Sequence, residues 1–131
     1  IQFSRINTES LKSILITSSA PQEGKTTIAV NLAGSFATSK KKVLLIDCDL
    51  RKPSVHKLFN RDKVPGLIDY LVGGAKLDEV LIKSEIPNLS IILSGTIPPN
   101  PAEMLDSQEM RNFLKKLRDQ FDLIISVKFF S

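Results

Sequence analysis

The chain has 131 residues, of which 42% are hydrophobic and 24% are charged, so one domain with a buried core fits better than a disordered or fibrous chain. Apolar runs such as 43–46 are too short to cross a bilayer, and residues 1–4 lack the features of a signal peptide. The single cysteine, Cys48, excludes an internal disulfide and agrees with a reducing compartment. We therefore expect a cytoplasmic protein.

The net charge is +4, with basic residues clustered at 40–42 and at 115–118. Such clusters attract nucleic acid or an anionic membrane surface, but they are also typical of solvated helix ends. Aromatic residues are not interleaved with the basic ones, as they are in many proteins that bind single strands. The second interpretation is therefore favoured, and no nucleic-acid partner is expected.

In the first half of the chain, short apolar runs alternate with segments whose apolar residues recur at helical spacing. An apolar run rich in β-branched residues predicts a buried strand at 13–17, and helical spacing of apolar residues predicts a helix at 25–39. A second uninterrupted apolar run predicts another buried strand at 43–46. Pro53 suits the first turn of a short helix that ends near Phe59.

The second half continues this alternation. Two brief helices, a strand, a longer helix and a last strand are predicted at 66–73, 77–83, 89–93, 101–120 and 122–127. Asn100 followed by Pro101 predicts the start of the longer helix, and Ser107 predicts a break with a second cap. We therefore predict an α/β fold: a mostly parallel sheet with helices on both faces, in three layers, forming one domain over residues 1–131.

The stretch 19–27 lies between a predicted strand and a predicted helix, as a phosphate-binding loop does. Gly24 lets the backbone approach phosphate oxygens, Lys25 supplies a positive charge, and the Thr26 hydroxyl is a ligand for magnesium. The strict pattern G-x-x-x-x-G-K-[ST] fails at Ser19, so a simple turn is the alternative, which the flanking elements disfavour. The expected nucleotide-binding residues are Gln22, Glu23, Gly24, Lys25, Thr26 and Thr27.

Two carboxylates, Asp47 and Asp49, follow the second predicted buried strand, at the edge where open α/β sheets bind ligands. Together with Thr26 they are expected to hold magnesium, and with Lys25 they form the expected catalytic set. The alternative is a solvated acidic turn paired with nearby cations such as Arg51. Beside a phosphate loop, the functional interpretation is favoured.

Three stretches, 18–26, 45–53 and 98–105, together resemble the cytosolic domain of bacterial tyrosine kinases of capsule and exopolysaccharide assembly. In that family the first stretch is the Walker A motif of a P-loop NTPase and the second is the Walker A′ motif. The resemblance implies that Lys25 and Thr26 bind ATP and Mg²⁺, and that Asp47 and Asp49 bind the metal or act as base. It also implies phosphorylation of a tyrosine-rich tail.

The resemblance further implies partners and a location. A membrane-bound adaptor of the polysaccharide co-polymerase type is expected to activate the kinase, and a homo-oligomer is expected as a second association. The domain is then expected in the cytoplasm, at the inner face of the cell membrane through its adaptor, where it regulates polysaccharide synthesis and export.

Three positions bear on the rival interpretations. Partition and division-site ATPases carry a signature lysine where this chain has Ala20, so the kinase branch is favoured over them. The family's last strand ends in an aspartate at the position of Val127, which cannot bind a metal-bound water. The only tyrosine is Tyr70, whose helical spacing predicts a core position. We therefore expect a C-terminally incomplete domain, for which an inactive nucleotide-binding remnant is the alternative.

Overall fold

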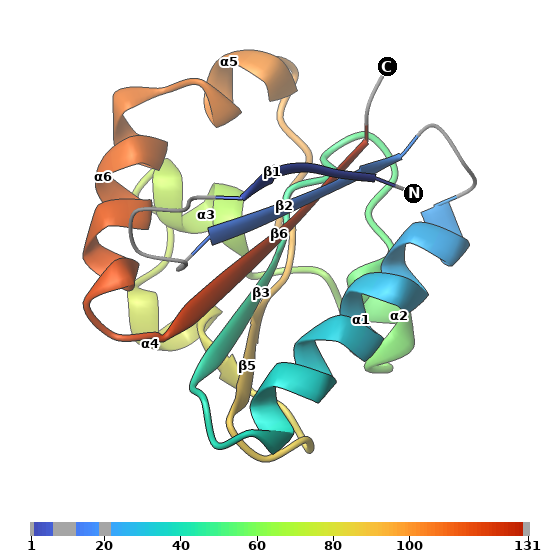
Figure 1. The fold of residues 1–131 in the computed structure, drawn as a ribbon. Helices are drawn as coiled ribbons and strands as arrows, with labels where there is room; N and C mark the ends of the chain where they lie inside the picture. The colour runs from blue at the N-terminus through green and yellow to red at the C-terminus, as the bar shows by residue number, and fades with distance from the viewer. Residues whose placement is uncertain (1, 7–12, 19–21, 130–131) are drawn as a thin grey trace.

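The computed structural model describes residues 2–6, 13–18 and 22–129. The strands of this described part are β1 (Gln2–Ile6), β2 (Ser13–Ser18), β3 (Val43–Asp47), β4 (Ile82–Lys83), β5 (Leu89–Ile92) and β6 (Leu123–Phe129). The helices are α1 (Gln22–Thr38), α2 (Val55–Leu58), α3 (Leu67–Leu71), α4 (Leu77–Val80), α5 (Pro101–Leu105) and α6 (Gln108–Arg118). Helices lie on both faces of the sheet (Figure 1), so the predicted α/β fold is confirmed.

The described strands form one sheet in the order β1-β2-β6-β3-β5-β4. The four inner strands are parallel, and β1 and β4 add antiparallel edges. The last strand, β6, lies between β2 and β3, so that Val127 pairs with Ile16 on one side and with Asp47 on the other. The ends of β2 and β3 therefore flank the same end of β6. This brings the two predicted motifs together at the carboxyl ends of the parallel strands, the carboxyl edge of the sheet.

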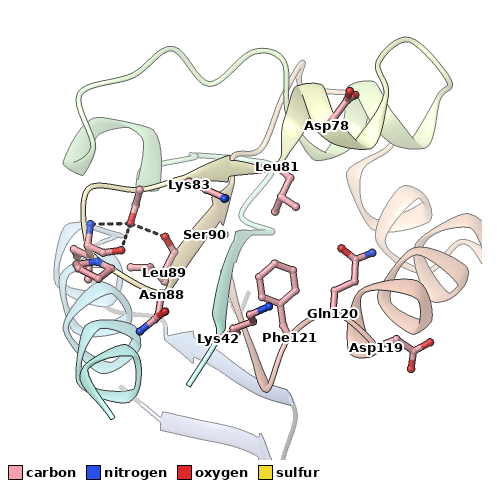
Figure 2. A pocket seen from close by; sticks show the side chains of 13 residues that line it. Lys42, Asp78, Leu81, Lys83, Asn88, Leu89, Ser90, Asp119, Gln120 and Phe121 are labelled. Atoms are coloured by element: carbon pink, nitrogen blue, oxygen red, sulfur yellow. Dashed lines mark hydrogen bonds between the residues drawn. The ribbon is translucent and has the colours of Figure 1, made fainter. Parts of the chain in front are cut away.

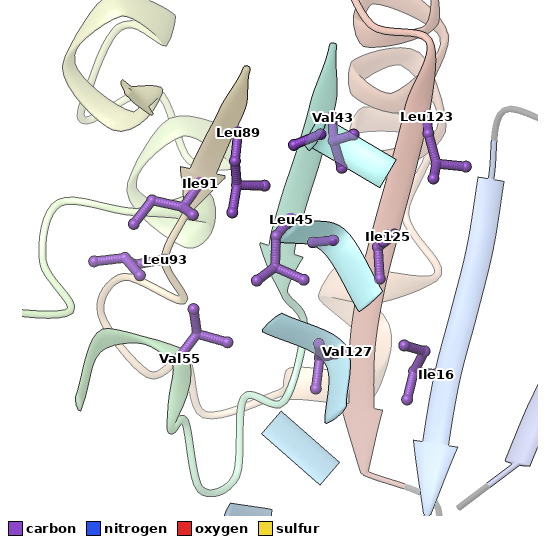
Figure 3. Close-up of a cluster of buried hydrophobic side chains, with 13 residues drawn as sticks. Ile16, Val43, Leu45, Val55, Leu89, Ile91, Leu93, Leu123, Ile125 and Val127 are labelled. Atoms are coloured by element: carbon purple, nitrogen blue, oxygen red, sulfur yellow. The ribbon is translucent and has the colours of Figure 1, made fainter. Parts of the chain in front are cut away.

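One face of the sheet is covered by α1 and α2. Three alanines of α1 (Ala29, Ala33 and Ala37) are four residues apart and fully or almost fully buried, so the helix comes close to the strands. They meet the side chains that point to this face from β3, β5 and β6, together with Val55 of α2 (Figure 3). This packing holds the N-terminal end of α1 near the carboxyl ends of the strands.

The other face is covered by α3 and α6. Leu67 of α3 packs with Phe113 and Leu117 of α6 against Leu44 and Ile46 of β3. Alternate residues of β3 therefore point to opposite faces, and all five are buried. Such two-sided burial explains why the sequence reads here as an uninterrupted apolar run.

The helix predicted over 77–83 is wrong in its second half. α4 ends at Val80, Leu81 is extended (φ −85°, ψ 113°), and β4 pairs Ile82 with Ile91 of β5. Pairing with β5, which is close in space, decides the conformation here more strongly than the local apolar spacing.

Other boundaries differ by smaller amounts. α1 begins at Gln22 rather than at residue 25, and β1 adds a strand that the sequence did not predict. The break predicted at Ser107 is confirmed, because its side chain accepts a hydrogen bond from the Met110 N–H (3.1 Å) and caps α6. Among the described helices, none combines the length and apolar character needed to cross a membrane.

Candidate nucleotide-binding site

The phosphate loop predicted at 19–27 joins the end of β2 to the start of α1. Its first three residues, Ser19, Ala20 and Pro21, lie outside the described residues, and Gln22 and Glu23 are placed only as the first backbone positions of α1. Gly24 is exposed, and a Cβ atom added to it would meet no protein atom within 4 Å. The space beside this backbone is therefore open, which suits the close approach of a phosphate.

Lys25 is completely buried, which is unusual for a lysine, and its ammonium group forms an ion pair with Asp49. The Nζ–Oδ2 distance is 2.8 Å, and the Asp49 side chain is 1% exposed. Thr27, two residues after Lys25, is exposed. Because charges are buried only at high cost unless they are paired, this pair fixes the second motif against the first.

Thr26 is also buried, and its hydroxyl forms a hydrogen bond with the hydroxyl of Ser54. Ser54 directly precedes α2 and is 6% exposed. Ser54 was not predicted as a site residue, because a serine before a short helix indicates only a helix cap. In the structure its side chain makes no such cap bond.

Asp47 accepts three backbone hydrogen bonds at the end of β3. The Asp49 N–H donates to Oδ1 (3.0 Å), and the N–H groups of Ser54 and Val55 donate to Oδ2 (3.1 Å each). Asp47 therefore caps α2 in place of Ser54. Burial raises the pKa of Asp47 to about 6, although these backbone bonds act in the opposite direction.

The alternative of a solvated acidic turn is wrong, because Asp47 is completely buried and Asp49 is almost so. Asp49 makes its ion pair with Lys25 and not with Arg51, whose side chain is exposed. Its second oxygen accepts a hydrogen bond from the Lys52 N–H (3.2 Å). The two motifs are thus joined by buried polar contacts, as expected of one site.

The residues around Asp47 fit a magnesium ion in kind and number. Thr26, Asp47 and Asp49 carry oxygen atoms of the kind that Mg²⁺ prefers as ligands, and Mg²⁺ usually takes only one or two carboxylates beside phosphate and water. Within the described residues no group of three or more His, Cys, Asp or Glu side chains comes together. Burial is the main cause of the raised pKa of Asp47, whereas the equally buried Asp49 is paired with Lys25.

Val127, at the position where the resembled family has an aspartate, is completely buried in the apolar layer beneath α1. Its carbonyl oxygen accepts a hydrogen bond from the Cys48 N–H (2.8 Å). Cys48 itself faces the opposite apolar layer, and burial raises the pKa of its thiol to about 12. This part of the edge therefore contributes packing and no metal ligand.

Tyr70 packs beside Phe113, with ring centroids 4.4 Å apart, so the predicted core position is confirmed. Nearby, Asp69 joins α3 to the segment after β5. Its carboxylate accepts hydrogen bonds from the Gly66 N–H (2.8 Å), the Thr96 N–H (3.2 Å) and the Thr96 hydroxyl (2.7 Å). Asp69 was not selected from the sequence, where it is one polar position in a brief helix.

A cavity of about 740 Å³ lies near the amino ends of β3, β5 and β6, at the amino edge of the sheet (Figure 2). Leu81, Leu89 and Phe121 form its apolar part, and Lys42 and Asp78 are among its polar residues. None of the predicted site residues lines it. This cavity and the buried charged residues Lys25, Asp47 and Asp49 therefore lie at opposite ends of the parallel strands.

Comparison with known proteins agrees with this geometry. The family described as an AAA domain matches residues 12–126. Tyrosine-protein kinase YwqD of Bacillus subtilis (strain 168) is 42% identical over 125 residues, which cover 95% of this chain and 52% of YwqD. The chain thus spans about half the length of this curated relative.

Two solved structures are similar in fold. The kinase domain of the Escherichia coli tyrosine kinase ETK has a TM-score of 0.82 and 37% identity, with 89% of this chain and 46% of that chain covered. The septum site-determining protein MinD of Pyrococcus horikoshii, solved with Mg-ADP, has a TM-score of 0.70 and 28% identity, covering 88% and 47%. The predicted resemblance to bacterial tyrosine kinases and the P-loop type of fold are both confirmed.

Proposed function

The chain belongs to the AAA domain family, and from this membership together with its similarity to bacterial tyrosine kinases we propose that it is the ATP-binding domain of a bacterial tyrosine kinase that takes its nucleotide with Mg²⁺. The observation that carries the proposal is the buried ion pair between Lys25 and Asp49, which joins the start of α1 to the end of β3. A buried lysine at the N-terminal end of a helix that follows a parallel strand is placed to meet phosphate.

Phosphate binding is assigned to the start of α1. The N–H groups of its first turn, including that of Gly24, lack partners within the helix and attract anions. Lys25 exchanges its contact with Asp49 for the outer phosphates, so that one negative partner replaces another. Gln22, Glu23 and Thr27 complete the proposed nucleotide-binding residues.

Metal binding is assigned to Thr26, Asp47 and Asp49. When bound, Mg²⁺ supplies positive charge that neutralises the phosphate oxygens during transfer. Asp47 and Asp49 are the carboxylates proposed to accept the proton of the attacking hydroxyl group, and Lys25 orients the phosphate that is transferred. The burial of all three charged side chains excludes water from these contacts and strengthens them.

The setting proposed for this activity is capsular or exopolysaccharide synthesis and export. We propose a cytoplasmic domain held at the inner face of the membrane by a membrane-bound adaptor, and homo-oligomers as a second association. The support is the resemblance to tyrosine kinases of these systems and the similarity to a putative tyrosine-protein kinase in the cps region of Klebsiella pneumoniae, which is 37% identical over 112 residues. The test is whether phosphotyrosine forms on a tyrosine-rich tail peptide in the presence of the adaptor. If intact protein forms no phosphotyrosine, the proposal is contradicted.

The first test is a calorimetric titration with Mg-ADP of the chain and of its Lys25→Ala variant. We expect the wild-type chain to bind and the variant to lose binding, because the positive charge for the phosphates is gone. Lys42→Ala is the matched control, since Lys42 is exposed at the opposite edge, and it should bind as the wild type does. Equal binding by all three proteins would contradict the assignment of the phosphate loop.

A second candidate function, nucleotide binding without turnover, is favoured by the burial of Val127 in the apolar layer. The side chain of Val127 has no oxygen atom, so it cannot hold a metal-bound water as a carboxylate would. The candidate predicts Mg-ADP binding together with no steady-state release of phosphate from ATP. A rate of release that Lys25→Ala abolishes would remove this candidate and favour the kinase.

A further inference from the structure

Ser54 occupies the junction between the two parts of the proposed site. It lies between the end of β3 and the start of α2, with backbone angles of φ −139° and ψ −15°, and it is almost completely buried. Its hydroxyl contacts the Thr26 hydroxyl, and its N–H donates to Asp47 Oδ2 at 3.1 Å. One residue is therefore in direct contact with two of the three groups proposed to hold magnesium.

The hydroxyl of Ser54 does not cap the helix that follows it, although serine hydroxyls at this position normally do. A serine before a helix usually accepts a hydrogen bond from the first turn. Here the Val55 N–H donates to Asp47 Oδ2 (3.1 Å), and Ser54 makes no side-chain cap bond. Because Asp47 caps α2, the Ser54 hydroxyl is available to Thr26.

The chemistry of a threonine ligand explains what this contact supplies. A hydroxyl group has one proton to donate and two lone pairs. A threonine that offers a lone pair to a cation needs an acceptor for its proton, and groups that hold a ligand in this way strongly affect metal affinity. The Ser54 oxygen is at hydrogen-bond distance and is held by a buried backbone that is tied to Asp47.

We propose that Ser54 is a positioning residue for magnesium: it accepts a hydrogen bond from the Thr26 hydroxyl, directs the Thr26 oxygen toward the metal, and links that oxygen to Asp47. This inference rests on the proposed function, because it concerns the same nucleotide site. Ser54 itself is not placed in contact with the nucleotide or the metal. Ser54 acts on the metal only through Thr26 and Asp47.

The test compares ADP affinity with Mg²⁺ and with EDTA for Ser54→Ala, Ser54→Thr and a control, Ser94→Ala. Ser94 is a suitable control because it is completely buried and its hydroxyl donates only to the nearby Gly95 carbonyl (3.3 Å). Ser54→Ala should weaken Mg-ADP binding by about 10- to 100-fold, as loss of such supporting bonds does. Binding in EDTA should stay within about twofold, since Lys25 and the amides of α1 do not depend on Ser54.

Rescue distinguishes positioning from a general structural role. Ser54→Thr keeps the hydroxyl and should restore the Mg-ADP affinity, while Ser94→Ala should leave it unchanged. If Ser54→Ala does not fold, Ser54→Cys replaces it, because a thiol fills similar space and is only a weak hydrogen-bonding group. Circular dichroism melting confirms that each variant is folded.

The possible failures can be told apart. A wild-type chain that binds Mg-ADP beside a Ser54→Ala variant of equal affinity overturns the role of Ser54 alone. An equal loss with Mg²⁺ and with EDTA also overturns it, because the effect then lies on the phosphates or the fold. A folded wild-type chain that binds no ADP under either condition overturns the proposed function, and the inference with it.

Discussion

The two edges of the sheet use their polar residues in opposite ways. At the carboxyl edge, Lys25 and Asp49 are buried and paired, and Thr26 and Asp47 are buried with partners of their own. At the amino edge, Lys42 and Asp78 are exposed around an open cavity of about 740 Å³. A buried polar group has a large energetic effect when its partner is removed, whereas an exposed one has little effect.

The contrast indicates which end of the parallel strands can carry chemistry. The cavity at the amino edge is an open hollow, and polar residues that line it, such as Lys42 and Asp78, are exposed to solvent. The carboxyl edge holds the groups whose burial must be compensated. A carboxylate and an ammonium are kept out of water only where other contacts hold them, and these contacts are what a nucleotide and its metal can replace.

The largest contrast is expected between Lys25→Met and Lys42→Met. Loss of Lys25 leaves the Asp49 charge buried without its ion-pair partner, which should lower the free energy of unfolding by about 3–5 kcal/mol. The same change at exposed Lys42 should stay within about 0.5 kcal/mol. Urea unfolding of both variants measures the difference, and equal stabilities would break the distinction between the two edges.

A second contrast uses pH and Asp47. Its pKa in the folded chain is about 6 against an ordinary value of 3.8, so the folded state binds the proton more tightly. Stability should therefore rise as the pH falls from above 6 toward 4, by about 3 kcal/mol at most for this group. Asp47→Asn should remove this rise, measured by urea unfolding in EDTA.

The titration of His56 changes the stability in the opposite direction over the same pH range. Burial, and then the nearby charges of Lys57 and Lys63, lower its pKa from 6.5, so its contribution to stability falls as the pH falls. The comparison must therefore be the difference between wild type and Asp47→Asn, in which the His56 contribution cancels. A difference that does not change between pH 4 and 7 would show that Asp47 titrates normally and is not desolvated.

The sequence predicted what local pattern controls. The run at 43–46 became β3 because both of its faces are buried, and Ser107 became a helix cap because its signal lies within three residues. The two motifs were placed at one edge because parallel strands end there. In each case the physical cause acts between neighbours along the chain or follows from the fold class.

What the sequence did not predict depends on contacts between distant residues. Ile82 adopts an extended conformation because it meets Ile91 in β5, and its own spacing indicated a helix. The contact between Thr26 and Ser54 joins residues 28 positions apart, and the Lys25–Asp49 pair joins residues 24 apart. Asp47 was predicted as a ligand, but its additional role as the cap of α2 could not be read from the local sequence.

The smallest contrast pairs Asp69 at the carboxyl edge with Asp78 at the amino edge. Asp69→Ala removes the acceptor of hydrogen bonds from Gly66 and Thr96, so the joint between α3 and the segment after β5 should loosen. Because Asp69 is only half-buried, the loss should be about 1–2 kcal/mol in the free energy of unfolding. Asp78→Ala, at an exposed residue of the cavity, should change it by less than about 0.5 kcal/mol. Equal losses would mean that the cavity contributes to stability as much as the bonded edge does, and the contrast between the edges would then hold only for fully buried charges.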